Sequence, residues 1–152
     1  VLRALLKAGA DPNKGVEYEI PLEMALQVAD KSGPEPVRFL LEAGANPNAL
    51  TLAGTPLFFA GTGNSADVGI LELLIKHGAN LDLTGPKGER VLFAAANGRN
   101  WKAVLYLLEH GVDSRVGQTL SGQDLRGMLE ANASWASADS GFADVREWLR
   151  TH

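Results

Sequence analysis

The chain has 152 residues, of which 45% are hydrophobic and 21% charged, and its formal net charge is −4. This composition suits one folded globular unit, and no apolar run reaches the roughly 20 residues that a membrane-spanning helix needs. The acidic balance argues against nucleic acid, because phosphate neutralisation needs a clustered basic face. We therefore expect neither nucleic acid nor a membrane as a partner.

The sequence contains no cysteine, which excludes disulfides and thiolate metal sites. This absence favours a reducing compartment such as the cytoplasm, and it leaves an export route open. The first residue is Val1 rather than Met, and it falls inside an expected helix. We therefore expect the natural N-terminus to be absent, which keeps secretion, the periplasm and a longer parent protein open as alternatives.

One pattern recurs four times: two apolar residues, two further residues, a glycine, and a turn that in most copies is rich in Asp, Asn and Pro. The copies cover residues 5–13, 40–48, 73–82 and 107–113. Their glycines, Gly9, Gly44, Gly78 and Gly111, are 35, 34 and 33 residues apart. A fixed period in this range is typical of a stacked repeat array. In each copy we expect a helix to end at a glycine in the left-handed conformation, and the turn to lead into the next repeat.

The segments upstream of these glycines complete the pattern. Thr55-Pro56-Leu57-Phe58-Phe59-Ala60 opens a helix with a hydroxyl cap and a proline at the first helical position, and residues 20–25 and 90–95 occupy the equivalent places. Together the motifs resemble ankyrin repeats, whose pattern is Thr-Pro-Leu-His-x-Ala in the first helix and Leu-Leu-x-x-Gly-Ala after the second. The resemblance covers nearly the whole chain. It implies an all-α solenoid of stacked antiparallel helix pairs joined by β-turn or hairpin fingers.

One position departs from the family pattern in every copy. Glu23, Phe58 and Phe93 stand where the family has a histidine after the leucine. The departure puts in question the usual hydrogen bonds between neighbouring inner helices, but it does not affect the predicted fold.

We predict a single domain over residues 1–152. Its units are a partial repeat (1–13), three repeats (14–48, 49–82 and 83–115) and a degenerate C-terminal capping unit (116–152). In the partial repeat, Leu2, Leu5 and Leu6 form an apolar stripe that we expect to lie on the next repeat.

The capping unit has its own expected helices. A capping box that begins at Ser121 is expected to open an inner helix that runs through Leu129. Residues 145–149 then repeat the apolar spacing of residues 104–108, which predicts an outer helix. Trp135, in the insertion between the two helices, is expected to pack as a lid on the last repeat.

The links between paired helices differ in length. The link is tight at residues 97–100, longer at 61–66, and longer still at 29–33. Such links line up along one rim of a stack, where lengthened loops often bind partners. Neutral drift at tolerant loops is the alternative explanation.

A rival motif overlaps the third repeat. Gly61-x-Gly63-x-x-Ala66 follows an apolar run and has Asp82 about 20 residues further on, which is the outline of a dinucleotide-binding fingerprint. That interpretation, a nucleotide-dependent enzyme, requires residues 57–60 to form a buried parallel strand. The repeat pattern instead predicts a helix there.

The three histidines are His77, His110 and His152. The first two occupy the same place before their glycines, but a metal site needs three or four ligands in fixed geometry, and no matching third ligand is present. We expect these side chains to bond nearby helix carbonyls. The carboxylates are scattered over polar faces, so we expect no metal, no cofactor and no catalytic residue.

The resemblance implies a non-catalytic protein-binding module, because family members hold other proteins on the concave surface lined by fingers and inner helices. Tyr18, Leu50 and Leu52 are apolar finger residues of the kind that anchor contacts. The full set of partner-binding candidates is Glu17, Tyr18, Glu19, Leu50, Leu52, Thr62, Thr84, Pro86, Lys87, Glu89, Asn97 and Gly98. We expect a monomer or a subunit of a hetero-complex. An inhibitor or immunity-type protein that blocks a partner enzyme is one alternative, and a purely structural module of a longer chain is another.

Overall fold

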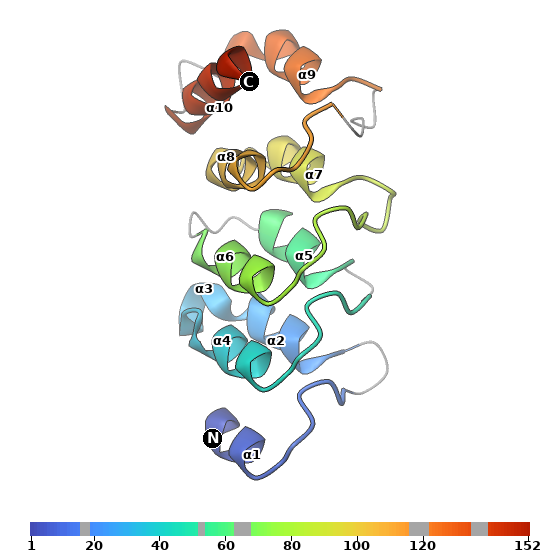
Figure 1. The fold of residues 1–152 in the computed structure, drawn as a ribbon, viewed down its shortest axis with the longest axis vertical. Coiled ribbons are helices and arrows are strands. Elements are labelled where there is room, and N and C mark those ends of the chain that lie inside the picture. Colours follow the sequence, from blue (N-terminus) through green and yellow to red (C-terminus); the bar gives the residue numbers. More distant parts are fainter. Residues whose placement is uncertain (16–18, 52–53, 63–67, 116–121, 135–139) are drawn as a thin grey trace.

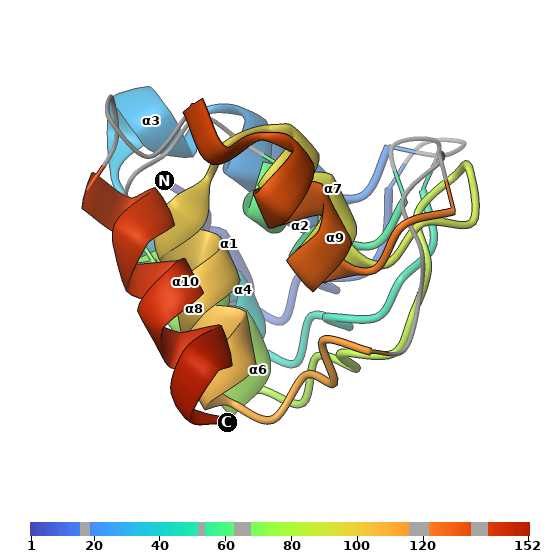
Figure 2. The ribbon, with the colours of Figure 1, turned by 90° about the horizontal axis from the view of Figure 1, so that it is seen from above.

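The computed structural model describes residues 1–15, 19–51, 54–62, 68–115, 122–134 and 140–152. Its helices stack along the long axis of the molecule in an inner and an outer column (Figures 1 and 2). The inner column consists of α2 (Pro21–Gln27), α5 (Pro56–Thr62), α7 (Val91–Asn97) and α9 (Leu125–Ala131). The outer column consists of α1 (Leu2–Lys7), α4 (Glu35–Glu42), α6 (Gly69–Lys76), α8 (Trp101–Glu109) and α10 (Ser140–Thr151). The described residues contain no strand, and isolated bridges join residue 51 to residue 54 and residue 84 to residue 90. The prediction of an all-α solenoid is confirmed.

Two helices begin at the caps that the sequence predicts. Thr55 caps α5, with its Oγ1 accepting a hydrogen bond of 3.3 Å from the Phe58 N–H. Asn100 caps α8 in the same way, accepting from the Ala103 N–H at 3.3 Å. Between these two helices lies α7, in which six successive residues, 91–96, are buried. This inner helix therefore lies at the centre of the core.

Each outer helix of the repeats ends at a glycine. Gly9, Gly44, Gly78 and Gly111 have φ values of 89°, 91°, 88° and 87°. These angles lie in the left-handed region, which only glycine adopts without strain. The predicted termination is therefore confirmed in all four copies.

We expect Gly78→Val to lower the free energy of unfolding by about 1–2 kcal/mol or more, because a β-branched residue is strained at this φ. A Cβ atom at this position would meet no heavy atom within 4 Å, so the cost is conformational rather than steric. Urea unfolding measures it, and Gly98→Ala, at a φ of −76°, is the control. Equal losses for the two variants would contradict the repeat register.

The turn after each glycine is held by a side-chain oxygen. In all four turns an Asp or Asn accepts a 2.9 Å hydrogen bond from the backbone N–H two residues later, as expected for Asx turns. Two asparagines also join neighbouring repeats. Asn13 donates to the Gly44 carbonyl (3.1 Å) and accepts from the Asn46 N–H (2.7 Å), and Asn48 bonds Gly78 (2.9 Å) and the next turn's N–H (2.7 Å) in the same way. The sequence analysis did not predict this ladder of asparagines.

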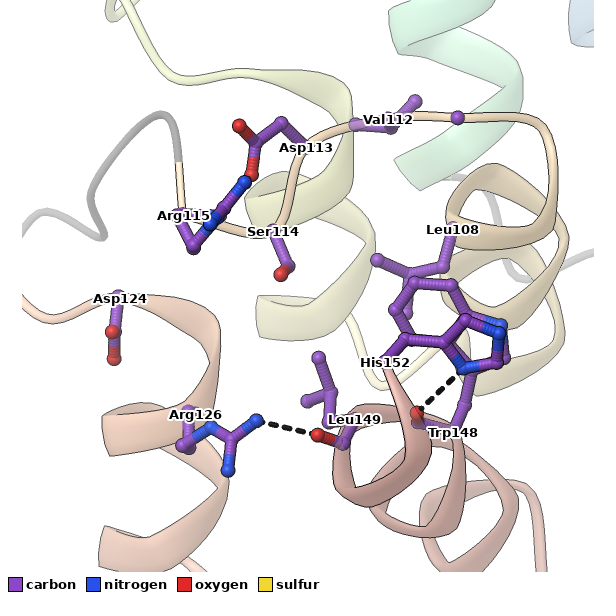
Figure 3. Close-up of a pocket in the computed structure, with 11 residues that line it drawn as sticks. Leu108, Val112, Asp113, Ser114, Arg115, Asp124, Arg126, Trp148, Leu149 and His152 are labelled. Atoms are coloured by element: carbon purple, nitrogen blue, oxygen red, sulfur yellow. Dashed lines mark hydrogen bonds and ion pairs between the residues drawn. The ribbon is translucent and has the colours of Figure 1, made fainter.

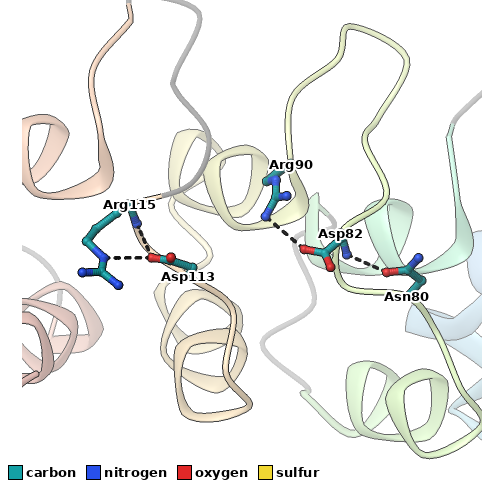
Figure 4. A network of polar contacts seen from close by, with 5 residues as sticks. All are labelled: Asn80, Asp82, Arg90, Asp113 and Arg115. Atoms are coloured by element: carbon teal, nitrogen blue, oxygen red, sulfur yellow. Dashed lines mark hydrogen bonds and ion pairs between the residues drawn. The ribbon is translucent and has the colours of Figure 1, made fainter.

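At the next repeat the ladder changes to charged residues. Asp82 stands at the position of Asn13 and Asn48, and a carboxylate has no N–H to donate to a carbonyl. It pairs with Arg90 at 3.1 Å instead, and the following turn contains a second ion pair, Arg115 to Asp113, at 3.2 Å (Figure 4). The third and fourth repeats are therefore joined partly by the ion pair between Asp82 and Arg90, whereas the pair of Arg115 and Asp113 lies within one turn.

We expect the stability of the stack to depend on the ionisation of Asp113. Hydrogen bonds from the backbone and side chain of Arg115 hold the pKa of Asp113 below its ordinary value, and the charges of Arg115 and Arg90 lower it further. A carboxyl whose pKa is lower in the folded state stabilises the fold above its ordinary pKa, and this contribution is lost as the pH falls through the lowered value. Urea unfolding of the original chain and of Asp113→Asn, which keeps the acceptor oxygen, should therefore differ at neutral pH and converge in acid. A difference independent of pH would contradict this assignment.

The family histidine is replaced by packing in the third repeat. The buried ring of Phe58 lies against the backbone of two fingers, since a Cβ atom added to Gly85 would fall 2.2 Å from the ring and one added to Gly54 would fall 3.2 Å from it. Phe93 is fully buried, whereas Glu23 is half-buried. In the two phenylalanine repeats, apolar contact thus stands where the family pattern has a polar side chain.

Three expectations need correction. The link at residues 29–33 is not a plain loop: residues 29–32 form a one-turn helix, α3 (Ala29–Ser32), whose first residue is buried. The N-cap of helix α9 is Asp124, which accepts from the Gly127 N–H at 2.7 Å, so the helix begins three residues after the predicted cap position. Ser121 itself lies outside the described residues. The stripe on α1 is also only partly right, because Leu5 is 54% exposed while Leu2 and Leu6 pack on the core.

The capping unit closes the C-terminal end through its outer helix. Helix α10 packs against α8, with Val145 and Leu149 buried and Trp148 half-buried, as the repeated spacing predicts. The ring of Phe142 meets Trp101 edge-on, with centroids 4.9 Å apart. Trp135, the predicted lid, lies outside the described residues.

Candidate functional site: the finger face

The described parts of the loops that lead into α2, α5 and α7 lie together on one side of the helix columns (Figure 2). We call these loops the fingers (residues 14–20, 49–55 and 83–90), and we call the fingers together with the inner helices the finger face. Residues 91–96 of α7 are buried, so on the finger face the fingers and the helix ends are open for contact, and the middle of α7 is not.

Most of the described candidates are exposed on this face. Leu50 is 76% exposed, so its apolar side chain is open to contact with a partner. The other exposed candidates are Glu19, Thr62, Thr84, Pro86, Lys87, Asn97 and Gly98. Glu17, Tyr18 and Leu52 lie outside the described residues.

The third finger is a closed turn that presents its tip. The Gly85 N–H donates to the Glu89 carbonyl at 2.7 Å, and the Gly88 N–H donates to the Gly85 carbonyl at 2.9 Å. Pro86 and Lys87 lie at the exposed tip between these bonds. Glu89 is half-buried, and its Oε2 is buried with no hydrogen-bond partner among the described residues, so Glu89 is less open to a partner than the tip residues.

The ends of two inner helices meet at the rim. The Thr62 carbonyl oxygen lies 3.6 Å from the point that a Cβ atom on Gly98 would occupy, and Asn100 donates to the Gly61 carbonyl at 3.3 Å. The Thr62 hydroxyl turns back to the Phe58 carbonyl at 3.0 Å. The fold therefore brings Thr62 and Gly98 together, as the predicted alignment of the links implies. Of the candidates in the first finger, Glu19 is the one that lies among the described residues.

Two exposed apolar residues at the inner helix α2 were not among the candidates. Met24, in α2, and Val28, its C-cap residue, are 54% and 47% exposed. Their i, i+4 spacing puts them on one side of the helix, and that spacing was the signal available in the sequence.

The dinucleotide-binding interpretation lacks its strand. Residues 57–60 belong to helix α5, and the repeat interpretation predicts this helix. The packing of the helices explains why residue 61 is a glycine, because a Cβ atom there would lie 2.5 Å from Cγ2 of Val91 on the next inner helix. Gly63 and Ala66 lie outside the described residues.

The histidines bond helix carbonyls as predicted. Nδ1 of His77 lies 2.8 Å from the Leu73 carbonyl oxygen, and Nδ1 of His110 lies 2.7 Å from that of Tyr106. The His110 ring also stacks on Tyr106. Burial raises the pKa of Tyr106, and the charge of Glu72 raises it by a smaller amount. The described residues contain no group of three possible metal ligands.

A pocket of about 580 Å³ opens where the fourth repeat meets the capping unit (Figure 3). Its charged side chains have partners within the chain: Arg115 pairs with Asp113, Arg126 donates to the Leu149 carbonyl, and Asp124 caps α9. None of the predicted candidates lines it. We therefore assign no ligand to this pocket.

Comparison with known proteins gives one result. A family model described as "Ankyrin repeats (3 copies)" matches residues 24–118, which run from within α2 to beyond the end of α8. No curated protein matches the chain. Within the described residues, no helix has the length and apolar character needed to cross a membrane.

Proposed function

Because the chain belongs to the ankyrin-repeat family, we propose that it is a non-catalytic module that binds another protein through the finger face. Ankyrin repeats generally serve protein–protein interaction. One observation carries the proposal. The residues of the inner helices that pack against other repeats are buried, whereas Leu50, Lys87 and the C-terminal ends of α5 and α7 are exposed on one face. An exposed apolar anchor beside polar side chains is a usual composition for a contact surface.

Affinity capture with the purified chain, followed by mass spectrometry, tests the proposal. We expect a partner protein that the original chain retains and that Leu50→Ser and Lys87→Glu lose. Lys76→Glu is the matched control, since Lys76 is exposed on the outer helix α6, and it should retain the partner. Equal retention by all variants would place binding elsewhere. If the captured partner is an enzyme, loss of its activity on stoichiometric addition of the chain would specify an inhibitor role.

The nucleotide alternative has a separate readout. We expect NAD, FAD and ATP to leave the melting temperature unchanged. A ligand that binds only the native state stabilises it by about 2.7 kcal/mol at a hundredfold excess over its dissociation constant, so binding would be visible as a shift. A shift that is lost in Gly63→Val would restore the dinucleotide-binding interpretation.

A further inference from the structure

Two neighbouring inner helices carry large apolar residues that the stack does not bury. Met24, in α2, and Val28, at its C-cap, are 54% and 47% exposed. Phe59 stands three residues after the first proline of α5, as Met24 does in α2, and it is half-buried. Helix α5 packs against both α2 and α7, so Phe59 stays partly open although its helix has neighbours on both sides. We call Met24, Val28 and Phe59 the apolar patch.

The apolar patch has a defined extent along the stack. The place of Met24 and Phe59 is taken in α7 by Ala94, which is 8% exposed and lies in the buried run 91–96. The patch therefore covers α2 and α5 and stops at α7 (Figure 1). Packed helices lie roughly 8–10 Å apart, and this distance separates the places of Met24 and Phe59.

The charge of the finger face changes along the same direction. Residues 14–28, the first finger with α2, contain one basic and three acidic residues: Lys14, Glu17, Glu19 and Glu23. Residues 49–62, the second finger with α5, contain no charged residue. Among the described residues, the carboxylates of Glu19 and Glu23 take part in no ion pair. An acidic region beside an apolar one is complementary to a partner that is both basic and apolar.

The spacing of the apolar patch favours a helical occupant. In a helix, residues seven apart lie on the same side and are separated by about 10.5 Å along the axis, which is close to the distance between packed helices. In an extended strand, residues on one face are roughly 6.6 or 13 Å apart, and neither distance matches.

We infer that the apolar patch binds a basic amphipathic helix of the partner protein. Apolar side chains at i and i+7 of this helix lie on Met24 and Phe59, and its lysines or arginines face Glu19 and Glu23. The inference rests on the proposed function, and it specifies the class of partner and the part of the finger face that holds it.

A synthetic peptide tests this inference. The probe is a fluorescently labelled peptide of about 18 residues, made of Ala, Leu and Lys, with leucines at i, i+4, i+7 and i+11 so that they share one side of a helix. Binding is measured by fluorescence anisotropy. We expect Met24→Gln to weaken binding by about tenfold, the loss expected when a large apolar side chain is no longer buried. Leu5→Gln is the matched control, since Leu5 is also 54% exposed but lies on the outer helix α1, and it should bind as the original chain does.

Two control peptides test the charge and the conformation of the occupant. A peptide with Glu in place of every Lys should bind more weakly, and so should one in which two central alanines are replaced by proline, which breaks a helix. The inference is overturned if either control binds as tightly as the lysine peptide, if Leu5→Gln weakens binding as much as Met24→Gln, or if the original chain does not bind the lysine peptide. Self-association of the chain that Met24→Gln abolishes would also overturn it, because a second copy would then occupy the patch.

The outcome can be separated from that of the proposed function. The peptide experiment needs no captured partner. If Leu50→Ser and Lys87→Glu lose a captured partner while Met24→Gln retains it, the proposed function stands and the apolar patch is not part of the binding surface.

Discussion

Replacing Leu74 by alanine should lower the free energy of unfolding by about 2–5 kcal/mol, the range for a truncated leucine in a packed core. Leu74 is 0% exposed, and its helix, α6, packs against both α4 and α5. The substitution therefore weakens contacts within one repeat and between two repeats, which both contribute to the stability of a repeat array.

Leu5→Ala is the matched control, because Leu5 occupies the same register position but is 54% exposed. It should cost much less than Leu74→Ala in urea unfolding. Similar losses for the two variants would contradict the placement of Leu74 in the centre of the stack.

The second large effect is expected at Gly85, where an added methyl group has no room. A Cβ atom there would lie 2.2 Å and 2.3 Å from two ring carbons of Phe58, and this ring is buried. Overpacking of this kind costs about 1–3 kcal/mol, so we expect Gly85→Ala to destabilise the third and fourth repeats.

Two further variants assign the cause. In a Phe58→Ala background the added cost of Gly85→Ala should nearly vanish, which a double-mutant cycle of unfolding free energies measures. Gly98→Ala, where the new methyl group meets its neighbours at 3.4–3.6 Å, should be mild. A full cost of Gly85→Ala without the Phe58 ring would show that the backbone at Gly85, rather than the ring, is the constraint.

The contact between Phe58 and Gly85 marks the limit of what the sequence alone could predict. The period of the glycines and the caps at Thr55 and Asn100 are local signals, and they correctly predicted the stacked helix pairs and the starts of α5 and α8. The contact of Phe58 with a glycine in the next finger depends on how two repeats pack, which no local pattern encodes. The same applies to the asparagines that join neighbouring repeats.

The errors have local physical reasons. At α9, Ser121 and Asp124 are both residue types that cap helices, so the sequence allowed two start positions, and the structure has the helix begin after Asp124. At residues 29–32 the buried Ala29 allows one helical turn to pack between α2 and α4, where composition indicated only a loop.

For the finger face, sequence reasoning found exposed residues such as Leu50 and Lys87 because the family pattern marks their positions. It ranked Glu89 with them, although the carboxylate of Glu89 is partly buried. It did not select Met24, whose exposure depends on which helix lies beside α2 and not on the residue itself.

Hydrogen exchange of the chain with and without its captured partner tests the central claim most directly. If the finger face binds the partner, protection should increase in residues 49–62 and 83–98 and should stay unchanged in the outer helices α4, α6 and α8. Protection confined to those outer helices, with the fingers unchanged, would contradict the account.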